Sequence, residues 1–598
     1  MNYEQIFLKA SATQFGLLGS LFFIGLSIVF PSLQEAFWVL ALVLSAVTLF
    51  ISGFALRTWW RFKRRLQQRG LETYSPKQFF NHLKKRKFAN TFLLGKGFAW
   101  NSGHCQAVHN FTTDTSDDLA DLRKQINTPG KESQGLRWLQ ALSEEKDITI
   151  PEREIFQHAL LVGSSGSGKT SALCALTAQA IAKGMCVIVI DPKGDNSLFH
   201  AIKTFSLLAQ REFKQLRLGH LDEATPMNLL ANFSSPSEVA TRIGQILPGE
   251  TNDPFRKMSE AALRAVSGGM GLLGEKPTFN SLQVGLLDRI AFANRIMIRW
   301  LTSQKPNKEK LPCGRTPIET FDLLTALCDR FEKKPSELTT LIDFARKTDE
   351  RLDKTISPAK DVLAQFTVGK LGTLLSPSLS SEKDCFTVRK LIERNSVFYL
   401  GTDALQDVSL ARSLSAFFLT DLASAAGDIY NYEPGEKRKV FVVIDEASEA
   451  CCEALTALLG KARGAGISLI LATQSLEDFT ARLGSKAEMN RVLANITSRI
   501  VMRIQDSASH NWISDQIAQA SIKTRSRTRT SANGAANLPL DGVSIGEREN
   551  VTIGVPLIAP DLYAQLPKGE AFVICQGGRI FKTRFPYISQ NEDYHGRE

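Results

Sequence analysis

Residues 158–182 read HALLVGSSGSGKTSALCALTAQAIA: a short apolar run, then a loop rich in glycine, then a stretch that favours helix. The loop matches G-x-x-x-x-G-K-[ST], whose glycines let backbone N–H groups close around phosphate oxygens at a helix N-terminus. In this pattern Lys169 reaches the β- and γ-phosphates and Thr170 binds Mg²⁺. The stretch therefore predicts a P-loop site for ATP and Mg²⁺. The candidate nucleotide-binding residues are Gly163, Ser164, Ser165, Gly166, Ser167, Gly168, Lys169 and Thr170.

Other short apolar runs resemble the one that precedes this loop, and helical patterns separate them. Continuous runs of four to eight apolar residues are typical of strands that are buried on both faces of a parallel sheet. An α/β fold is therefore predicted for this part of the chain. The six runs are 159–162, 185–190, 397–400, 440–444, 467–472 and 499–504.

Two acids, Asp445 and Glu446, directly follow the run VFVVI at 440–444. In a doubly wound sheet the carboxyl end of such a strand lies close to the phosphate-binding loop. This is the Walker B pattern, in which Asp445 holds the Mg²⁺ shell and Glu446 orients or activates the attacking water. The acidic pair is therefore expected to complete the nucleotide site.

Two further polar residues lie near the run 467–472. Gln474 follows the run and is expected at the same edge of the sheet, where its amide senses the γ-phosphate or positions water; a capping turn is the alternative interpretation. Arg463 precedes the run and is a candidate arginine finger for the site of a neighbouring subunit. A solvated surface arginine is the alternative there.

The N-terminus holds two uncharged apolar stretches, 11–30 and 36–56, each close to the ~20 residues that cross a bilayer. Six Lys or Arg residues follow the second stretch between Arg57 and Arg69, whereas the linker 31–35 has none. The positive-inside rule predicts two transmembrane helices with the body of the chain in the cytoplasm. Much of the net charge of +11 comes from this boundary, so the overall charge alone gives no argument for nucleic-acid binding.

Two internal segments depart from the α/β pattern. Residues 235–394 carry amphipathic helical patterns with few strand candidates, which predicts an inserted all-α domain. Residues 522–546 are polar, with Lys523 and three arginines alternating with Ser and Thr, and are expected to form a mobile loop. The expected divisions are a membrane anchor (1–70), a joining segment (71–150), the nucleotide-binding domain (151–234 and 395–590) and the all-α domain (235–394).

These motifs together resemble the TraD/TraG-type coupling proteins of conjugative type IV secretion systems, within the FtsK/HerA-like branch of P-loop motors. The resemblance covers most of the chain. It rests on the two N-terminal spans and on GSSGSGKT, VIVIDPKGD (187–195), NLLANFSSPSEVATRIGQIL (228–247), VFVVIDEAS (440–448), RGAGISLILATQS (463–475), VLANITSRIVMRIQD (492–506) and APDLYAQLPKGEAFV (559–573). LLGKGFAWNSGHCQ (93–106) is similar to the subgroup from integrative conjugative elements.

The resemblance implies a RecA-like nucleotide-binding domain that forms a hexameric ring, with an all-α domain that faces relaxase and DNA. On this chain it implies that Lys169 and Thr170 bind ATP and Mg²⁺, that Asp445 and Glu446 form Walker B, that Gln474 is the motif that follows, and that Arg463 acts across subunits. The linker between the two spans is shorter than in many relatives, so no soluble exported loop is expected to contact the secretion machinery.

The resemblance implies an inner-membrane ATPase that recruits relaxase-bound single-stranded DNA and drives it into a type IV secretion channel. Its implied partners are the relaxosome, channel components, the membrane and further copies of the chain in a hexamer. The alternative is a docking receptor for protein substrates that uses ATP as an assembly switch. DNA-stimulated ATP hydrolysis would separate the two functions.

Overall fold

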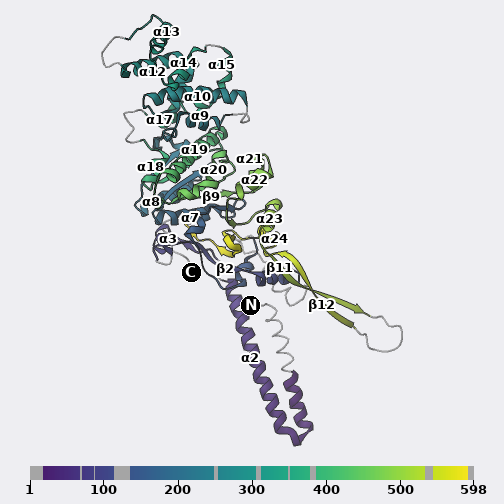
Figure 1. Ribbon diagram of the computed structural model, residues 1–598. Coiled ribbons are helices and arrows are strands. Elements are labelled where there is room, and N and C mark those ends of the chain that lie inside the picture. Colours follow the sequence, from purple (N-terminus) through teal and green to yellow (C-terminus); the bar gives the residue numbers. More distant parts are fainter. Residues whose placement is uncertain are drawn as a thin grey trace.

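The computed structural model of the 598-residue chain describes residues 18–67, 70–85, 88–113, 135–247, 253–304, 311–347, 350–377, 385–531 and 543–589. The molecule is elongated (Figure 1). A group of helices that includes α12–α15 lies at one end, a sheet with its covering helices forms the middle, and helix α2 (Gln34–Gln67) extends from the other end.

An 11-stranded sheet forms the body, in the order β3-β2-β14-β13-β10-β4-β9-β8-β5-β7-β6. The seven strands from β10 to β6 are parallel, and β13, β14, β2 and β3 extend the sheet in antiparallel pairs. All six runs predicted as strands lie in the parallel part, so the predicted α/β class is confirmed. The strands are β2 (Thr91–Trp100), β3 (Lys146–Pro151), β4 (Ala159–Val162), β5 (Cys186–Asp191), β6 (Phe213–Arg217), β7 (Val397–Gly401), β8 (Val440–Ile444), β9 (Ile467–Thr473), β10 (Ser498–Val501), β13 (Glu570–Ile574) and β14 (Ile580–Arg584).

Both faces of the parallel part are buried, because successive side chains of each strand enter different cores. Val442 and Ile444 of β8 belong to one core with helices α19 (Val408–Tyr432) and α20 (Glu453–Lys461). Phe441 and Val443 belong to the other core with α3 (Pro76–Leu83), α7 (Lys169–Ala182) and α8 (Asn196–Leu208). This double burial explains why six of the seven parallel strands were visible as apolar runs in the sequence.

Between β6 and β7 the chain runs through ten helices, α9–α18, over the described part of 236–393. α10 is central and contacts α9, α11, α12, α14, α15 and α16. The Arg242 guanidinium of α9 donates to the carboxylate of Asp421 in α19 at 3.2 Å. This hydrogen bond joins the inserted helices to a helix that packs on the sheet. The helices are α9 (Pro236–Gly244), α10 (Pro254–Leu272), α11 (Phe279–Leu287), α12 (Arg289–Gln304), α13 (Pro317–Cys328), α14 (Ser336–Arg346), α15 (Glu350–Thr355), α16 (Ser357–Gln365), α17 (Gly369–Leu375) and α18 (Val388–Glu393).

The N-terminal apolar stretches form two helices that lie side by side, with the Phe23 and Phe37 rings 6.3 Å apart. Among the described residues one helical segment, Glu35–Phe54, is long and apolar enough to cross a bilayer. The described part of the first expected span, Leu18–Val29, is shorter than the ~20 residues that a crossing needs. Residues 11–17 of that expected span lie outside the described residues, so the described part of the chain gives one candidate for the two predicted spans.

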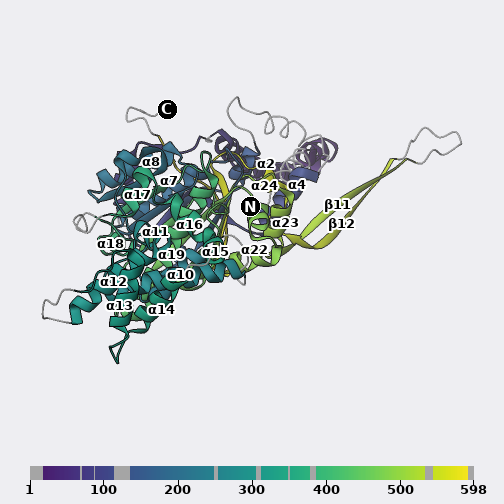
Figure 2. The same ribbon diagram turned by 90° about the horizontal axis from the view of Figure 1, so that it is seen from above.

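The polar segment that was expected to be a loop is paired over its described part. β11 (Gln519–Ser531) and β12 (Val543–Pro556) form an antiparallel ribbon that projects away from the body (Figure 2). The loop prediction is therefore wrong for these residues, and the central part of the segment, 532–542, lies outside the described residues. Alternation of Lys or Arg with Ser or Thr from Lys523 to Thr530 has the two-residue period of a strand, so the sequence pattern is compatible with the ribbon.

Candidate functional site

The glycine-rich loop connects the end of β4 to the start of α7, as its sequence predicts. Gly166 and Gly168 have φ of 73° and 105°, a left-handed conformation that favours glycine. A Cβ on Gly168 would lie 3.1 Å from the backbone nitrogen of Gly569, so a side chain there would be crowded as well as strained. The loop thus brings backbone N–H groups to the N-terminal end of α7, an arrangement suited to an anion.

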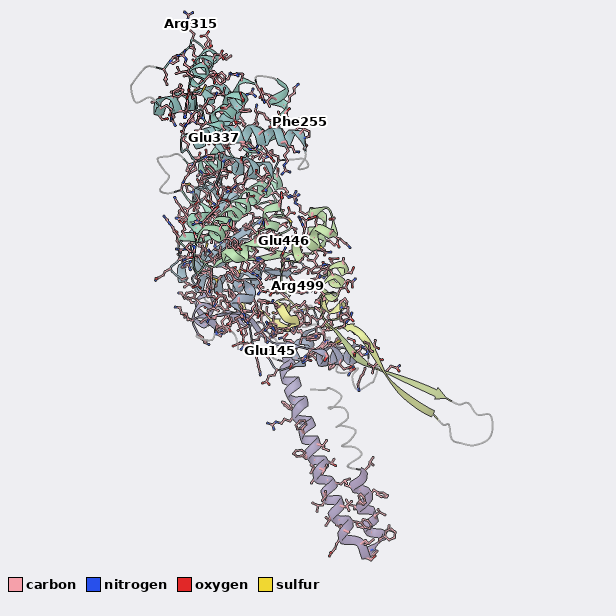
Figure 3. The ribbon with its side chains drawn as sticks, viewed as in Figure 1. Glu145, Phe255, Arg315, Glu337, Glu446 and Arg499 are labelled. Carbon is pink, nitrogen blue, oxygen red and sulfur yellow. The ribbon has the colours of Figure 1, made fainter. Side chains whose placement is uncertain are left out.

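The acidic pair lies at the same edge of the sheet as this loop, because β9 alone separates β4 from β8. Glu446 Oε1 is 4.0 Å from the Lys169 Nζ. Glu446 has a φ of 47°, unusual for a residue with a side chain, and its backbone position is fixed by Ala447, whose N–H donates to the Ala472 carbonyl at 2.7 Å. The two motifs, which are far apart in sequence, therefore form one site. Figure 3 shows Glu446 in the body of the molecule, between the helical end and α2.

One cavity of about 680 Å³ contains residues of both motifs. Lys169 is buried, and its Nζ donates to the Gly163 carbonyl at 2.5 Å. Burial lowers the pKa of the Lys169 ammonium, while the charges of Glu446 and Asp445 oppose this effect. The cavity lining includes Ser164, Ser165, Gly166, Gly168, Lys169, Thr170, Lys193, Asp195, Asp445, Glu446 and Lys568.

Asp445 is 4% exposed and lies close to other acids. Burial, followed by the charges of Asp191 and Glu446, raises the pKa of Asp445 to about 7, against the attraction of Lys193 and Lys169. A nearby cation stabilises the charged form of a carboxyl group in this environment. The Thr170 hydroxyl, which lines the same cavity, donates to Asp195 at 3.3 Å. A hydroxyl and a carboxylate are oxygen ligands of the kind that Mg²⁺ takes, so these residues fit the ion.

Gln474 reaches the site through Glu446. The Gln474 amide nitrogen donates to Glu446 Oε1 at 2.8 Å. The amide thus contacts the acidic pair, as its position after β9 suggests. Whether it also contacts a γ-phosphate stays a prediction.

Arg463 lies away from this cavity, at the opposite edge of the sheet. It belongs to η6 (Ala462–Ala465), which precedes β9, and it is exposed. It borders a second cavity of about 970 Å³ together with His158, the residue before β4, and with Tyr430. Arg463 therefore does not serve the site of its own chain, and a role in the site of a neighbouring copy stays a prediction.

Several residues of the site were not assigned a role by the sequence. Asp191 ends β5, the strand next to β8, and Lys193 and Asp195 follow it; the signal was DPKGD at the end of a buried run. Lys568 and the segment Tyr587–Ser589 come from the other end of the chain. No local pattern could have shown that these late residues close the cavity.

The same cavity is bounded by residues that follow α2. β1 (Thr73–Tyr74) pairs in parallel with β15 (Tyr587–Ile588), and Pro76 lines the cavity with both residues of β15. Leu71 comes close to Gly569, since a Cβ on that glycine would lie 2.8 Å from a Leu71 methyl carbon. The Gly569 N–H donates to the carbonyl of Ser167 at 2.8 Å. The segment after α2 is thus linked to the phosphate loop through a single residue.

Comparison with known proteins gives matches in the parts of the chain that build this site. Residues 144–203 match a family model described as the type IV secretion-system coupling protein DNA-binding domain. Residues 439–568 match one described as the TraM recognition site of TraD and TraG. The first match contains the P-loop and the DPKGD turn, and the second contains Asp445, Glu446, Arg463 and Gln474.

A curated relative and solved structures also match. The type 4 coupling protein DotL of Legionella pneumophila subsp. pneumophila (strain Philadelphia 1) is 22% identical over 526 residues, which cover 79% of this chain and 62% of DotL. The unbound conjugative coupling protein TrwBdeltaN70 is 14% identical with a TM-score of 0.48, over 80% of this chain and 93% of that one. TrwB in complex with ADP and Mg²⁺ is 14% identical with a TM-score of 0.47, over 79% and 92%. The two family models and the curated relative confirm that this chain is similar to the coupling proteins of type IV secretion systems.

Proposed function

We propose that this chain is a membrane-anchored ATPase that couples ATP hydrolysis to the transfer of relaxase-bound single-stranded DNA into a type IV secretion channel. The observation that carries the ATPase proposal is the meeting of the P-loop lysine with the acidic pair, with 4.0 Å between Lys169 Nζ and Glu446 Oε1 in one cavity. The DNA, relaxase and channel partners rest on the similarity to coupling proteins and on the descriptions of the two family models.

Each residue of the site has a proposed role. The loop 163–170 binds the phosphates through its N–H groups, and Lys169 moves from the Gly163 carbonyl to the β- and γ-phosphates. Thr170 and Asp445 hold Mg²⁺, which when bound neutralises phosphate charge. Glu446 orients the attacking water and accepts its proton.

The positions of Arg463 and of the nucleotide cavity favour a ring of several copies. Arg463 and the nucleotide cavity lie at opposite edges of the sheet, so a head-to-tail contact between two copies brings Arg463 of one to the cavity of the next. Head-to-tail contacts close into a ring when the rotation permits, and a hexamer is the form proposed here. In this arrangement α2 holds each copy at the inner membrane, and the bulk of the chain lies in the cytoplasm.

The test is ATP hydrolysis by the full-length protein in lipid nanodiscs, with and without single-stranded DNA and over a range of salt concentrations. We expect Mg²⁺-dependent hydrolysis that DNA stimulates, with a stimulation that weakens as salt rises, because phosphate contacts release counterions. Lys169→Ala should remove the activity. ATP binding without DNA-stimulated turnover would refute the pump and favour the docking receptor.

A further inference from the structure

The turn that follows β5, Asp191–Asp195, is held by an unusual number of contacts. The Asp191 carboxylate is completely buried and accepts hydrogen bonds from the N–H groups of Lys193 (2.9 Å), Gly194 (3.1 Å) and Asp195 (2.7 Å). The hydroxyl of Tyr399 donates to the same carboxylate at 2.6 Å. Four donors on one buried carboxylate fix the backbone of the turn.

The turn is also fixed from its outer side. Gly194 has a φ of 69°, and a Cβ on it would lie 2.2 Å from a carboxylate oxygen of Asp403. The N–H of Ala404 donates to the Pro192 carbonyl at 2.8 Å. Lys193 is therefore presented from a backbone that has little freedom to move, while its side chain remains 48% exposed.

The Lys193 side chain points to the candidate catalytic acid. Its ammonium forms an ion pair with Glu446 Oε1, the oxygen that also accepts from the Gln474 amide at 2.8 Å and lies 4.0 Å from the Lys169 Nζ. Burial lowers the pKa of Lys193, but the hydrogen bond and charge of Glu446 outweigh it and raise the pKa above its usual value. One carboxylate oxygen is thus shared by two cations and an amide.

A bound nucleoside triphosphate changes the balance of charge around Glu446 Oε1. Lys169 binds the β- and γ-phosphates in P-loop sites, so the γ-phosphate is the part of the nucleotide nearest to Glu446. A γ-phosphate beside a carboxylate repels it unless a cation lies between them. Lys193 lines the same cavity as the phosphate loop and its side chain is 48% exposed, so it can contact both groups. A nucleoside diphosphate lacks the γ-phosphate and therefore has no phosphate at this position beside Glu446.

We propose that Lys193 is a positioning residue that distinguishes ATP from ADP. Without a γ-phosphate it holds Glu446 by the observed ion pair, and with one it bridges Glu446 and the γ-phosphate, so that the carboxylate stays oriented for the attacking water. This inference rests on the proposed function, because it assigns a role within the same nucleotide site.

The test compares Lys193→Ala and Lys193→Arg with the full-length wild type and with Lys439→Ala. Lys439 is a matched control: it is 50% exposed and pairs with the largely buried Glu152 at 2.6 Å, beside the opposite end of strand β8. The measurements are binding of ADP, binding of a non-hydrolysable ATP analogue, kcat, and the thermal unfolding midpoint.

For Lys193→Ala we expect ADP affinity within about twofold of the wild type, and affinity for the analogue and kcat each lowered by about tenfold or more, as for a lost charge-assisted hydrogen bond. Lys193→Arg keeps the charge and should recover part of both losses. Lys439→Ala should leave ADP binding, analogue binding and kcat near wild type, and any change in its thermal unfolding midpoint measures the loss of a comparable ion pair away from the site.

The outcomes separate this inference from the proposed function. If Lys193→Ala binds the analogue and turns over ATP like the wild type, the role of Lys193 is refuted while the ATPase stands. If the variant loses ADP and analogue affinity equally together with thermal stability, Lys193 is a structural residue and the inference is again refuted. A wild type that binds neither nucleotide would refute both.

Discussion

Asp445→Asn is the substitution whose effect can be worked out most fully from the structure. Burial and the neighbouring acids raise the pKa of Asp445 from 3.8 to about 7 in the folded, nucleotide-free protein. Because the folded pKa is the higher one, the folded state binds more protons than the unfolded state between about pH 4 and pH 7. Stability therefore falls as pH rises through this window and levels off above it.

The size of the effect follows from the width of the window. Each pKa unit corresponds to about 1.4 kcal/mol, and about two of the three units lie between pH 5 and pH 7. The wild type should lose about 3 kcal/mol of stability between pH 5 and pH 8 that Asp445→Asn does not lose, since asparagine cannot ionise. The variant should consequently be the more stable protein at pH 8.

The assay is urea unfolding in EDTA at pH 5 and pH 8, followed by fluorescence. Glu449→Gln is the control, because Glu449 is a half-buried carboxylate three residues after Glu446 that pairs with Arg412. Adding Mg²⁺ and ATP at pH 8 should stabilise the wild type more than Asp445→Asn. Equal pH dependence in the wild type and the variant would show that Asp445 does not titrate as argued.

Four further outcomes are expected. Lys169→Ala should lower nucleotide affinity to an undetectable level in a binding titration, whereas Glu446→Gln should bind ATP normally and fail to hydrolyse it; normal turnover by either contradicts the proposed roles. Mixing Arg463→Ala with Lys169→Ala protein should restore hydrolysis, because the intact arginine of one copy serves the intact loop of the other, and no recovery in the mixture counts against an arginine finger. Gly569→Ala should lower the free energy of unfolding by about 1 kcal/mol or more and weaken nucleotide binding, since its φ of 78° and the nearby Leu71 leave no room for a methyl group. An unchanged urea midpoint and nucleotide affinity would refute the proposed link from Leu71 through Gly569 to the phosphate loop.

The sequence predicted the part of the fold that is encoded locally. Six of the seven parallel strands contain the apolar runs that the sequence shows, and the motif residues stand at the ends of these runs; β6, at the margin of the sheet, reads FKQLR and was not predicted. The P-loop, Asp445 and Glu446 were predicted together for this reason, and the structure brings them into one cavity.

The antiparallel strands that extend the sheet could not be predicted from the sequence in the same way. In β2, Gly95 and Gly97 interrupt the apolar pattern and resemble turn residues. In the structure they let β2 lie against β14, since a Cβ would come within 1.9 Å of the Arg584 carbonyl oxygen at Gly95 and 2.0 Å of that of Lys582 at Gly97. These two glycines are therefore required by β14, a strand almost 500 residues away in the chain.

The rim of the site was missed for the same physical reason. Pro76, Lys568 and Tyr587 meet at the cavity because β1 pairs with β15, a contact between the two ends of the chain. Arg463 was predicted to act in the site of a neighbouring copy, and η6, which precedes β9, sets it at the edge of the sheet opposite the cavity of its own chain. The sequence alone does not show which surface of a neighbouring copy this arginine meets.

The contact between Leu71 and Gly569 joins the segment after α2 to the glycine-rich loop. Gly569 contacts the loop directly through Ser167, and the carbonyl of Gly70 accepts a hydrogen bond from Arg584 at 2.6 Å, so the segment that follows α2 is held on two sides. In the proposed membrane-anchored ATPase, a tilt or rotation of α2 is therefore expected to reach the phosphate loop through this contact. By the same route, tightening of the loop around a triphosphate is expected to pull on α2, so the proposed anchor would take part in the ATPase cycle.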